Sequence, residues 1–397
     1  MTKLIKAALA ALLGRAAPAP TESAPAVDAA SVAAAEANAF GADLYRALAP
    51  RGGNLLISPI NISAAFAMAQ AGAAGETAAQ MATVFHRSLP PGQTSALLEQ
   101  LGGEWDGGQV LFANRLWLQD GFHLHSAFEQ AMAETHGAGL ERVNFEGAPE
   151  PSKRAINQWI EDRTAGRIRD MLPKPPEGPL VITSALYLKA AWAAGFWSFG
   201  TKVEDFHAPE GVVPAPLMNA TLSLRYLEGP DFKAVALPYR GERLSMALIV
   251  PDRNDGLGEL EQSLDGARLN GWLAALRTNP RREIVLTLPK FSFDDGAAMK
   301  PLLSRLGMGV AFTDKADFSN LSEAPLKIGE ARARTFISVD EAGTEAAATT
   351  TNAVVRTTFA VRQTIPPVVV RADHPFLFAI FDEATGAVLF LGRLVRP

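Results

Sequence analysis

The chain has 397 residues, of which 48% are hydrophobic, and its mean hydropathy is +0.07. This size and composition indicate a globular protein with a large buried core rather than a disordered one. The net charge is −5 and the basic residues are dispersed, so no basic stripe supports binding to nucleic acid or to a glycosaminoglycan. Because cysteine is absent, disulfides, thiolate nucleophiles and cysteine-ligated zinc are excluded.

The N-terminal segment, residues 1–30, has the layout of a secretory signal. Lys3 and Lys6 precede a short apolar run at Ala7–Leu13, and small residues that suit a cleavage site follow. This pattern predicts an extracytoplasmic protein, secreted or periplasmic. The alternative is a disordered tail, rich in alanine and proline, on a cytoplasmic protein. No later run approaches the roughly 18 apolar residues of a membrane span.

Beyond this segment, helical spacing dominates the first half of the chain and strand-like runs dominate the second. The expected helices are Ser31–Leu48, a helix that Ser58 caps and that has Pro59 in its first turn, and Ile156–Leu172. The expected strands are Leu55–Ile57, Val110–Gln119, Leu180–Trp192, two within Phe232–Pro251, Ile284–Phe293, and a hairpin within His374–Val395. With no internal repeat, residues 31–397 are expected to form a single α+β domain with large antiparallel sheets.

No arrangement of catalytic residues is apparent in the sequence. The six histidines lack the HExxH spacing of zinc proteases, and His123 and His125 fit a solvated strand end better than a metal pair. The run GFWSFG, Gly195–Gly200, does not have the spacing of a nucleophile elbow, and no phosphate-binding glycine loop is present. We therefore expect a protein that is not an enzyme and that has no cofactor or metal.

One long stretch, Val339–Pro367, has the chemistry of a strand but no obvious core-facing side. It contains mainly small and β-branched residues, and it ends at a proline pair. Five motifs around it, in order and at matching spacing, resemble the serpin family of serine protease inhibitors. They are NLLISPINISAAFAMAQAGA (Asn54–Ala73), LYLKAAW (Leu186–Trp192) followed by DFH (Asp205–His207), LPKFS (Leu288–Ser292), ISVDEAGTEAAA (Ile337–Ala348), and the C-terminal run Ala372–Pro397.

This resemblance covers roughly residues 30–397 and implies the serpin fold. That fold has three β-sheets, eight or nine helices and an exposed reactive-centre loop, here at about residues 341–365. The high alanine content and the signal-like start favour a bacterial source. The implied mechanism is suicide inhibition of a serine protease by a monomeric, metastable protein, which traps a covalent acyl-enzyme when its cleaved loop enters the largest sheet as a new strand.

The resemblance also assigns the hinge of this loop. The matching residues are Glu341, Gly343, Thr344, Glu345, Ala346, Ala347, Ala348 and Thr350. Strand alternation would place Thr344 inward and Glu345 outward, and the small inward residues that follow would permit insertion. This favours an inhibitor over a carrier, a chaperone or a plain protease substrate on the same scaffold.

The reactive bond has three candidates. Counting from the hinge glycine gives Thr357-Thr358, a loop one residue shorter gives Arg356-Thr357, and counting back from the proline pair gives Arg362-Gln363. We favour Arg356-Thr357, because arginine suits the acidic pocket of trypsin-like proteases, whereas threonine would suit elastase-like enzymes.

Further matches concern the base of the loop. Glu341 and Lys290 match an ion pair of the family. Trp192 matches a tryptophan packed beneath that region, although a plain core aromatic is an equally good interpretation.

A polar cluster is expected under the centre of the sheet. Ser58 and Asn61 match small polar residues there, whereas Ser184 and Ala333 stand where the family has asparagine and histidine. Because both partners of one hydrogen bond are replaced together, we expect no orphaned buried group.

Overall fold

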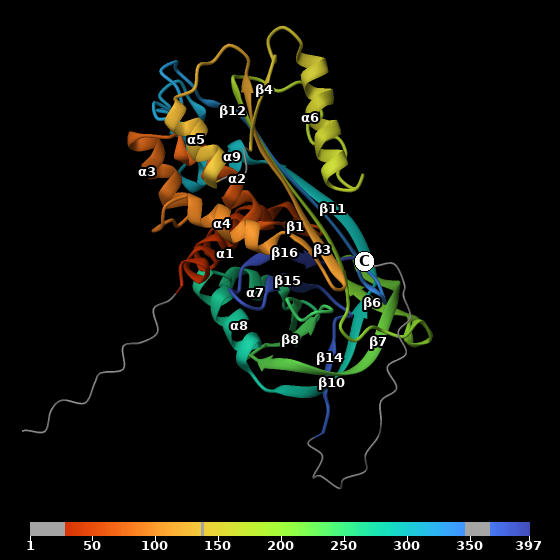
Figure 1. Ribbon diagram of the computed structural model, residues 1–397. Coiled ribbons are helices and arrows are strands. Elements are labelled where there is room, and N and C mark those ends of the chain that lie inside the picture. Colours follow the sequence, from red (N-terminus) through yellow and green to blue (C-terminus); the bar gives the residue numbers. More distant parts are fainter. Residues whose placement is uncertain (1–27, 136–138, 346–365) are drawn as a thin grey trace, which may run out of the picture.

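The structure is a computed structural model that describes residues 28–135, 139–345 and 366–397. Helices cover two β-sheets, and most of them gather at one end of the molecule (Figure 1). The helices among the described residues are α1 (Ala29–Leu48), α2 (Pro59–Ala71), α3 (Gly75–Val84), α4 (Gly92–Leu101), α5 (Ser126–Thr135), α6 (Pro149–Arg163), α7 (Leu257–Ser263), α8 (Gly266–Thr278) and α9 (Met299–Leu306). None of them is long and apolar enough to span a membrane.

The first sheet has seven strands, in the order β11-β12-β13-β5-β3-β2, with β4 paired to β3. Its strands are β2 (Gly103–Trp105), β3 (Gly108–Gln119), β4 (Leu140–Val143), β5 (Leu180–Ala191), β11 (Phe291–Ala298), β12 (Ile328–Val339) and β13 (Gly343–Thr344). β5 is buried along nearly its whole length, because α2 lies on one face of the sheet and α6 on the other. This explains its continuous apolar sequence.

The second sheet has nine strands, in the order β1-β16-β15-β9-β8-β7-β10-β14, with β6 paired to β7. Its strands are β1 (Leu55–Ile57), β6 (Lys202–Ala208), β7 (Gly211–Glu228), β8 (Phe232–Pro238), β9 (Leu244–Pro251), β10 (Arg281–Pro289), β14 (Val368–Arg371), β15 (Phe376–Asp382) and β16 (Val388–Leu394). The 18-residue β7 joins two halves of this sheet, since it pairs with β6 at one end and with β8 at the other. The three sheets that the resemblance implies are therefore one separate sheet and two halves of a continuous one.

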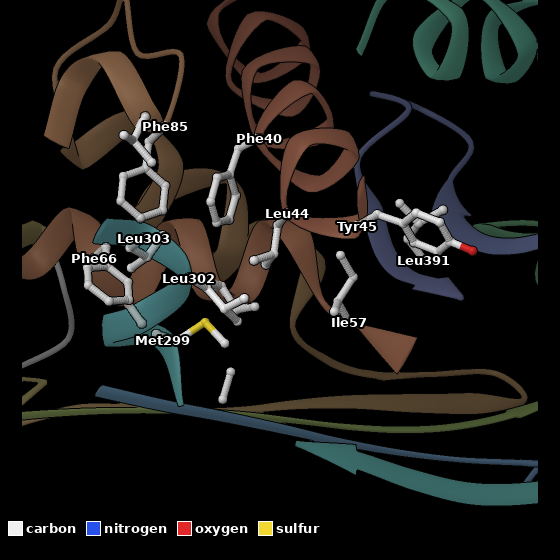
Figure 2. Close-up of a cluster of buried hydrophobic side chains, with 14 of the residues drawn as sticks. Phe40, Leu44, Tyr45, Ile57, Phe66, Phe85, Met299, Leu302, Leu303 and Leu391 are labelled. Carbon is white, nitrogen blue, oxygen red and sulfur yellow. The ribbon is translucent and has the colours of Figure 1, made fainter. Parts of the chain in front are cut away.

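The core between the helices and the sheets is filled by aromatic and aliphatic side chains. Phe40 and Phe66 both pack against Phe85, with ring centroids 4.5 and 5.2 Å apart. Figure 2 shows these rings beside Leu302 and Leu303 of α9. Because α2 is buried on all sides along Pro59–Ala69, its small alanines allow neighbouring elements to approach closely.

The first helix and the other predicted strands are present, but the strand expected at Ile284–Phe293 is divided at Lys290 between β10 and β11, and the helix expected at Ile156–Leu172 differs at both ends, since it begins at Pro149. Asp28 caps α1, since its Oδ1 accepts a hydrogen bond from the Ser31 N–H at 2.8 Å. The helix expected to reach Leu172 ends at Arg163, because Ala165 adopts a φ of 51° and breaks the helical backbone. The following connection (residues 164–179) instead packs Ile168 into a small cluster on β3 and β5.

Candidate functional site

The seven-stranded sheet contains a short strand that separates two parallel neighbours. β12 and β5 pair in parallel up to Thr335, which lies opposite Leu186. Beyond this point β13 lies between them and is antiparallel to both, with Thr344 opposite Val339 on one side and Ala190 on the other. The hinge has therefore already entered the sheet as far as Thr344.

A tight reversal brings β13 back beside β12. The Asp340 Oδ1 accepts hydrogen bonds from the backbone N–H groups of Ala342 and Gly343, at 2.8 and 3.2 Å. Gly343 has a φ of 153°, and a Cβ on it would lie 2.0 Å from the Ala190 carbonyl oxygen. Any larger residue would push β13 away from β5, so this position requires glycine.

The first inward residue of the hinge is held by two buried aromatic residues. Thr344 is only 1% exposed, and its Oγ1 lies 2.6 Å from the Tyr239 hydroxyl. Burial raises the pKa of Tyr239 far above its usual value, so this hydroxyl keeps its proton. Tyr239 stacks on Trp192, whose Nε1 donates to the Asp340 carbonyl at 2.9 Å. Trp192 therefore fits both interpretations, since it contacts the base of the loop and is also part of the core.

The structure also brings together the two residues expected at the base of the loop. The Lys290 Nζ lies 2.7 Å from the Glu341 Oε2, and the Thr201 Oγ1 donates to the other carboxylate oxygen at 2.8 Å. Burial pushes the pKa of Glu341 upward, but the hydrogen bonds from Lys290 and Thr201 outweigh it and hold this pKa below its usual value. A partly exposed pair of this kind contributes about 1 kcal/mol or less, so its main effect is to fix the position of the loop base.

Glu345, which was expected to point outward, is covered by another part of the chain. Its side chain is only 8% exposed, and it forms an ion pair with Arg167 of the connection that follows α6. The chain leaves the sheet here, since the φ of Glu345 is 54°. Burial raises the pKa of Glu345, and the charge of Arg167 opposes this shift. The outward face of the hinge is therefore covered rather than solvated.

A polar cluster lies under the centre of the sheet. The Asn61 Nδ2 donates to the Ser184 Oγ at 2.9 Å, and the Asn114 Nδ2 donates to the Asn61 Oδ1 at 2.7 Å. Asn114, on β3, lies directly opposite Ser184, and Ala333 lies opposite Ser184 on β12. Sequence analysis missed Asn114, although two neighbouring strands that each place one polar residue among apolar ones are a usable signal.

The remaining predicted site residues lie outside the described residues. They are the hinge residues Ala346, Ala347, Ala348 and Thr350 and the reactive-bond candidates Arg356, Thr357, Thr358, Arg362 and Gln363. The residues that flank this twenty-residue segment (346–365), Glu345 and Pro366, are described, so its attachment points are known.

Comparisons with known proteins decide the family. A family model described as "Serpin (serine protease inhibitor)" matches residues 35–397. The chain belongs to the serpin family. An uncharacterized serpin-like protein of Thermococcus kodakarensis is 39% identical over 370 residues, covering 91% of this chain and 84% of the relative. The leukocyte elastase inhibitor of Homo sapiens is 32% identical over 380 residues, covering 90% and 97%.

Solved serpin structures share this fold. The native state of the thermophilic serpin tengpin matches with a TM-score of 0.82 and 27% identity, covering 91% of this chain and 93% of tengpin. The serpin fold expected from the sequence motifs is thereby confirmed, including an α+β architecture with nine α-helices among the described residues.

This serpin departs from two expectations at the sheet centre. Ser58 begins α2, but its side chain makes no capping hydrogen bond. Its Oγ is buried and has no hydrogen-bond partner among the described residues. A small cavity lined by Ser58, Ala333 and Thr335 lies beside it. The expectation of no orphaned group is therefore wrong at Ser58, although Ser184, one of the two replaced positions, is paired with Asn61.

Proposed function

We propose that this serpin inhibits serine proteases by inserting its cleaved loop into the seven-stranded sheet, and that its target is trypsin-like. The observation that carries the proposal is β13, an antiparallel strand already started between the parallel strands β12 and β5. The chain's membership of the serpin family and its similarity to a protein named as an elastase inhibitor support the proposal of protease inhibition in general.

The register of β13 shows where a longer insertion would lead. Each residue beyond Thr344 would lie one step further along both neighbours, and the backbone N–H of Glu345 already donates to the Ser338 carbonyl. Thr350 would then lie between Ala333 and Ser184, and its hydroxyl would face the polar cluster and the orphaned Ser58. The inward hinge residues are small enough for this path.

Insertion along this register exchanges one hydrogen-bonded ladder for two. The parallel pairing of β12 with β5 below Thr335 would open, and the new strand would pair with both edges. If about ten residues insert and each adds a net hydrogen bond of about 1 kcal/mol, the gain is of the order of 10 kcal/mol. A gain of this size can drive displacement of a bound protease.

The choice of target rests on the sequence of the loop. An arginine at Arg356 would fit the acidic pocket of a trypsin-like protease, whereas cleavage after Thr357 would direct the inhibitor to elastase-like enzymes. We also propose an extracytoplasmic location and a monomeric state, from the signal-like residues 1–30 and from the trapping mechanism.

Incubation with trypsin and with pancreatic elastase, followed by a denaturing gel, tests the proposal. We expect a covalent complex with trypsin that resists denaturation and that is absent with trypsin whose active-site serine is replaced by alanine. Cleaved serpin without any complex, with either protease, would show a substrate rather than an inhibitor.

A further inference from the structure

Apolar side chains gather on one exposed part of this molecule. Among the described residues, five large apolar side chains are strongly exposed, and four of them lie on β6, on β7 or on the turn that precedes β6. They are Trp197 (47% exposed), Phe199 (80%), Val203 (74%) and Val212 (55%). Single exposed apolar residues are common, but a cluster of them marks an interaction surface.

The aromatic pair is presented by an ordered turn. The rings of Trp197 and Phe199 stack, with centroids 5.7 Å apart and planes inclined by 23°. The turn is closed by a hydrogen bond from the Gly200 N–H to the Trp197 carbonyl at 2.8 Å. The preceding Phe196 is buried and anchors the turn to the core. Two large rings are thus held in solvent by a fixed backbone, which lowers the entropy lost on binding.

The β6–β7 hairpin extends this surface. Paired residues on antiparallel strands point to the same side, and Val203 pairs with Pro216, Asp205 with Pro214, and His207 with Val212. Because Phe206 and Ala208 point into the core, these six residues point outward. We call Trp197, Phe199, Val203, Val212, Pro214 and Pro216 the apolar hairpin face.

This face lies close to the chain on both sides of the 346–365 segment. On one side, the Phe196 N–H donates to the Glu341 carbonyl at 3.1 Å, and Thr201 binds the Glu341 carboxylate. On the other side, Glu204 forms an ion pair at 3.0 Å with Arg371, the last residue of β14. The chain on each side of the segment thus contacts β6 or its preceding turn, at Glu341 and at Arg371.

We propose that the apolar hairpin face is a docking site for the body of the trypsin-like protease that attacks the loop, an inference that rests on the proposed function. β6 and β14 are three strand spacings apart, which is about 15 Å. A protease of about 230 residues has a radius of gyration of about 17 Å, so its body is more than twice as wide. A protease that holds a bond of the 346–365 segment is therefore wide enough to reach this face at the same time.

The chemistry of the face selects an apolar partner surface. Its charged neighbours nearly cancel, since β6 carries both Lys202 and Asp205 and Glu204 is paired with Arg371. A polyanion would find no net positive field there. An exposed tryptophan beside a second ring is the type of residue that dominates protein–protein binding energy. Because the protease leaves this face when the loop inserts, docking raises the rate of association and leaves trapping unchanged.

The test compares two double variants at the aromatic pair. In the first, Trp197→Ser and Phe199→Ser remove the rings; in the matched control, Trp197→Tyr and Phe199→Tyr keep two rings at the same positions. We expect the association rate constant with trypsin to fall about tenfold in the serine variant and to stay within about twofold in the tyrosine variant. The stoichiometry of inhibition should not change in either. Equal rate constants in all three proteins would overturn the inference.

A binding measurement with inactive trypsin separates this inference from the proposed function. Trypsin whose active-site serine is replaced by alanine docks without forming an acyl-enzyme, so its Kd reports docking alone. If the wild type fails to trap active trypsin, the proposed function fails. A Kd weakened about tenfold by the serine variant would still support the docking face. The inference would be overturned if the serine variant leaves the Kd unchanged and if, in sedimentation, the wild type is a dimer while the variant is a monomer. That result would assign the face to a second copy of the chain.

Discussion

Replacing Thr344 by arginine is expected to convert the inhibitor into a substrate. Thr344 is 1% exposed and bonds to the buried Tyr239 hydroxyl, so the change orphans that hydroxyl, at a cost of about 1–3 kcal/mol. It also places an unpaired guanidinium beside the buried Tyr239, where desolvation costs several kcal/mol. In the uncleaved molecule, β13 can leave the sheet, which avoids most of this penalty. The loss of its two residue pairs with β5 then costs only about 2 kcal/mol. In a fully inserted loop the arginine must stay in the sheet, so the full penalty applies.

The consequence is kinetic, because insertion competes with hydrolysis of the acyl-enzyme. A penalty of about 3 kcal/mol on insertion slows it about 100-fold, which is enough for hydrolysis to win. The assay is the stoichiometry of inhibition with trypsin, together with the ratio of complex to cleaved serpin on a denaturing gel. The control is Thr344→Ser, which keeps the hydroxyl and should trap normally. Trapping by the arginine variant at the wild-type stoichiometry would refute the inward placement of Thr344 as a requirement for insertion.

Two further predictions concern residues that flank this position. Because burial raises the pKa of Glu345 despite Arg167 and the nearby Tyr187, a buried Glu345 is favoured below that pKa and disfavoured as pH rises through it. The unfolding free energy of the native form should therefore fall as the pH rises through the pKa of Glu345, and Glu345→Gln should weaken this dependence; a dependence that is unchanged in the variant would refute this. If Thr350 bonds to the cluster at Ser58 after insertion, Thr350→Val should lower the unfolding free energy of the cleaved form by about 1 kcal/mol. The unfolding free energy of the native form should not change. An equal loss in both forms would contradict the register.

The strands and the family could be predicted from sequence because their signals are local. The apolar run of β5 and the C-terminal hairpin follow directly from composition, and the glycine at 343 belongs to a motif. The end of α6 was missed, since TAGRIRDML keeps helical spacing of its apolar residues while the backbone turns at Ala165. Local periodicity does not report a positive φ at a residue other than glycine or asparagine.

Other features depend on contacts between distant segments. The cover over Glu345 comes from Arg167, nearly 180 residues earlier, and Asn114 joins the polar cluster only through strand pairing. The run GFWSFG lacks the spacing of a nucleophile elbow, and no sequence pattern shows that its rings are exposed near the loop stems. Exposure is a property of the assembled surface, so sequence alone did not reveal the apolar hairpin face.

The most direct test of the central claim is the unfolding temperature of the native serpin compared with that of the serpin nicked in the 346–365 segment. If the nicked loop completes the strand that β13 begins, the gain of about 10 kcal/mol should raise the unfolding temperature by about 20 °C or more. Mass spectrometry of the nicked protein identifies the bond, and a new N-terminus at Thr357 is expected for trypsin. Equal unfolding temperatures before and after nicking would contradict loop insertion and with it the proposed mechanism.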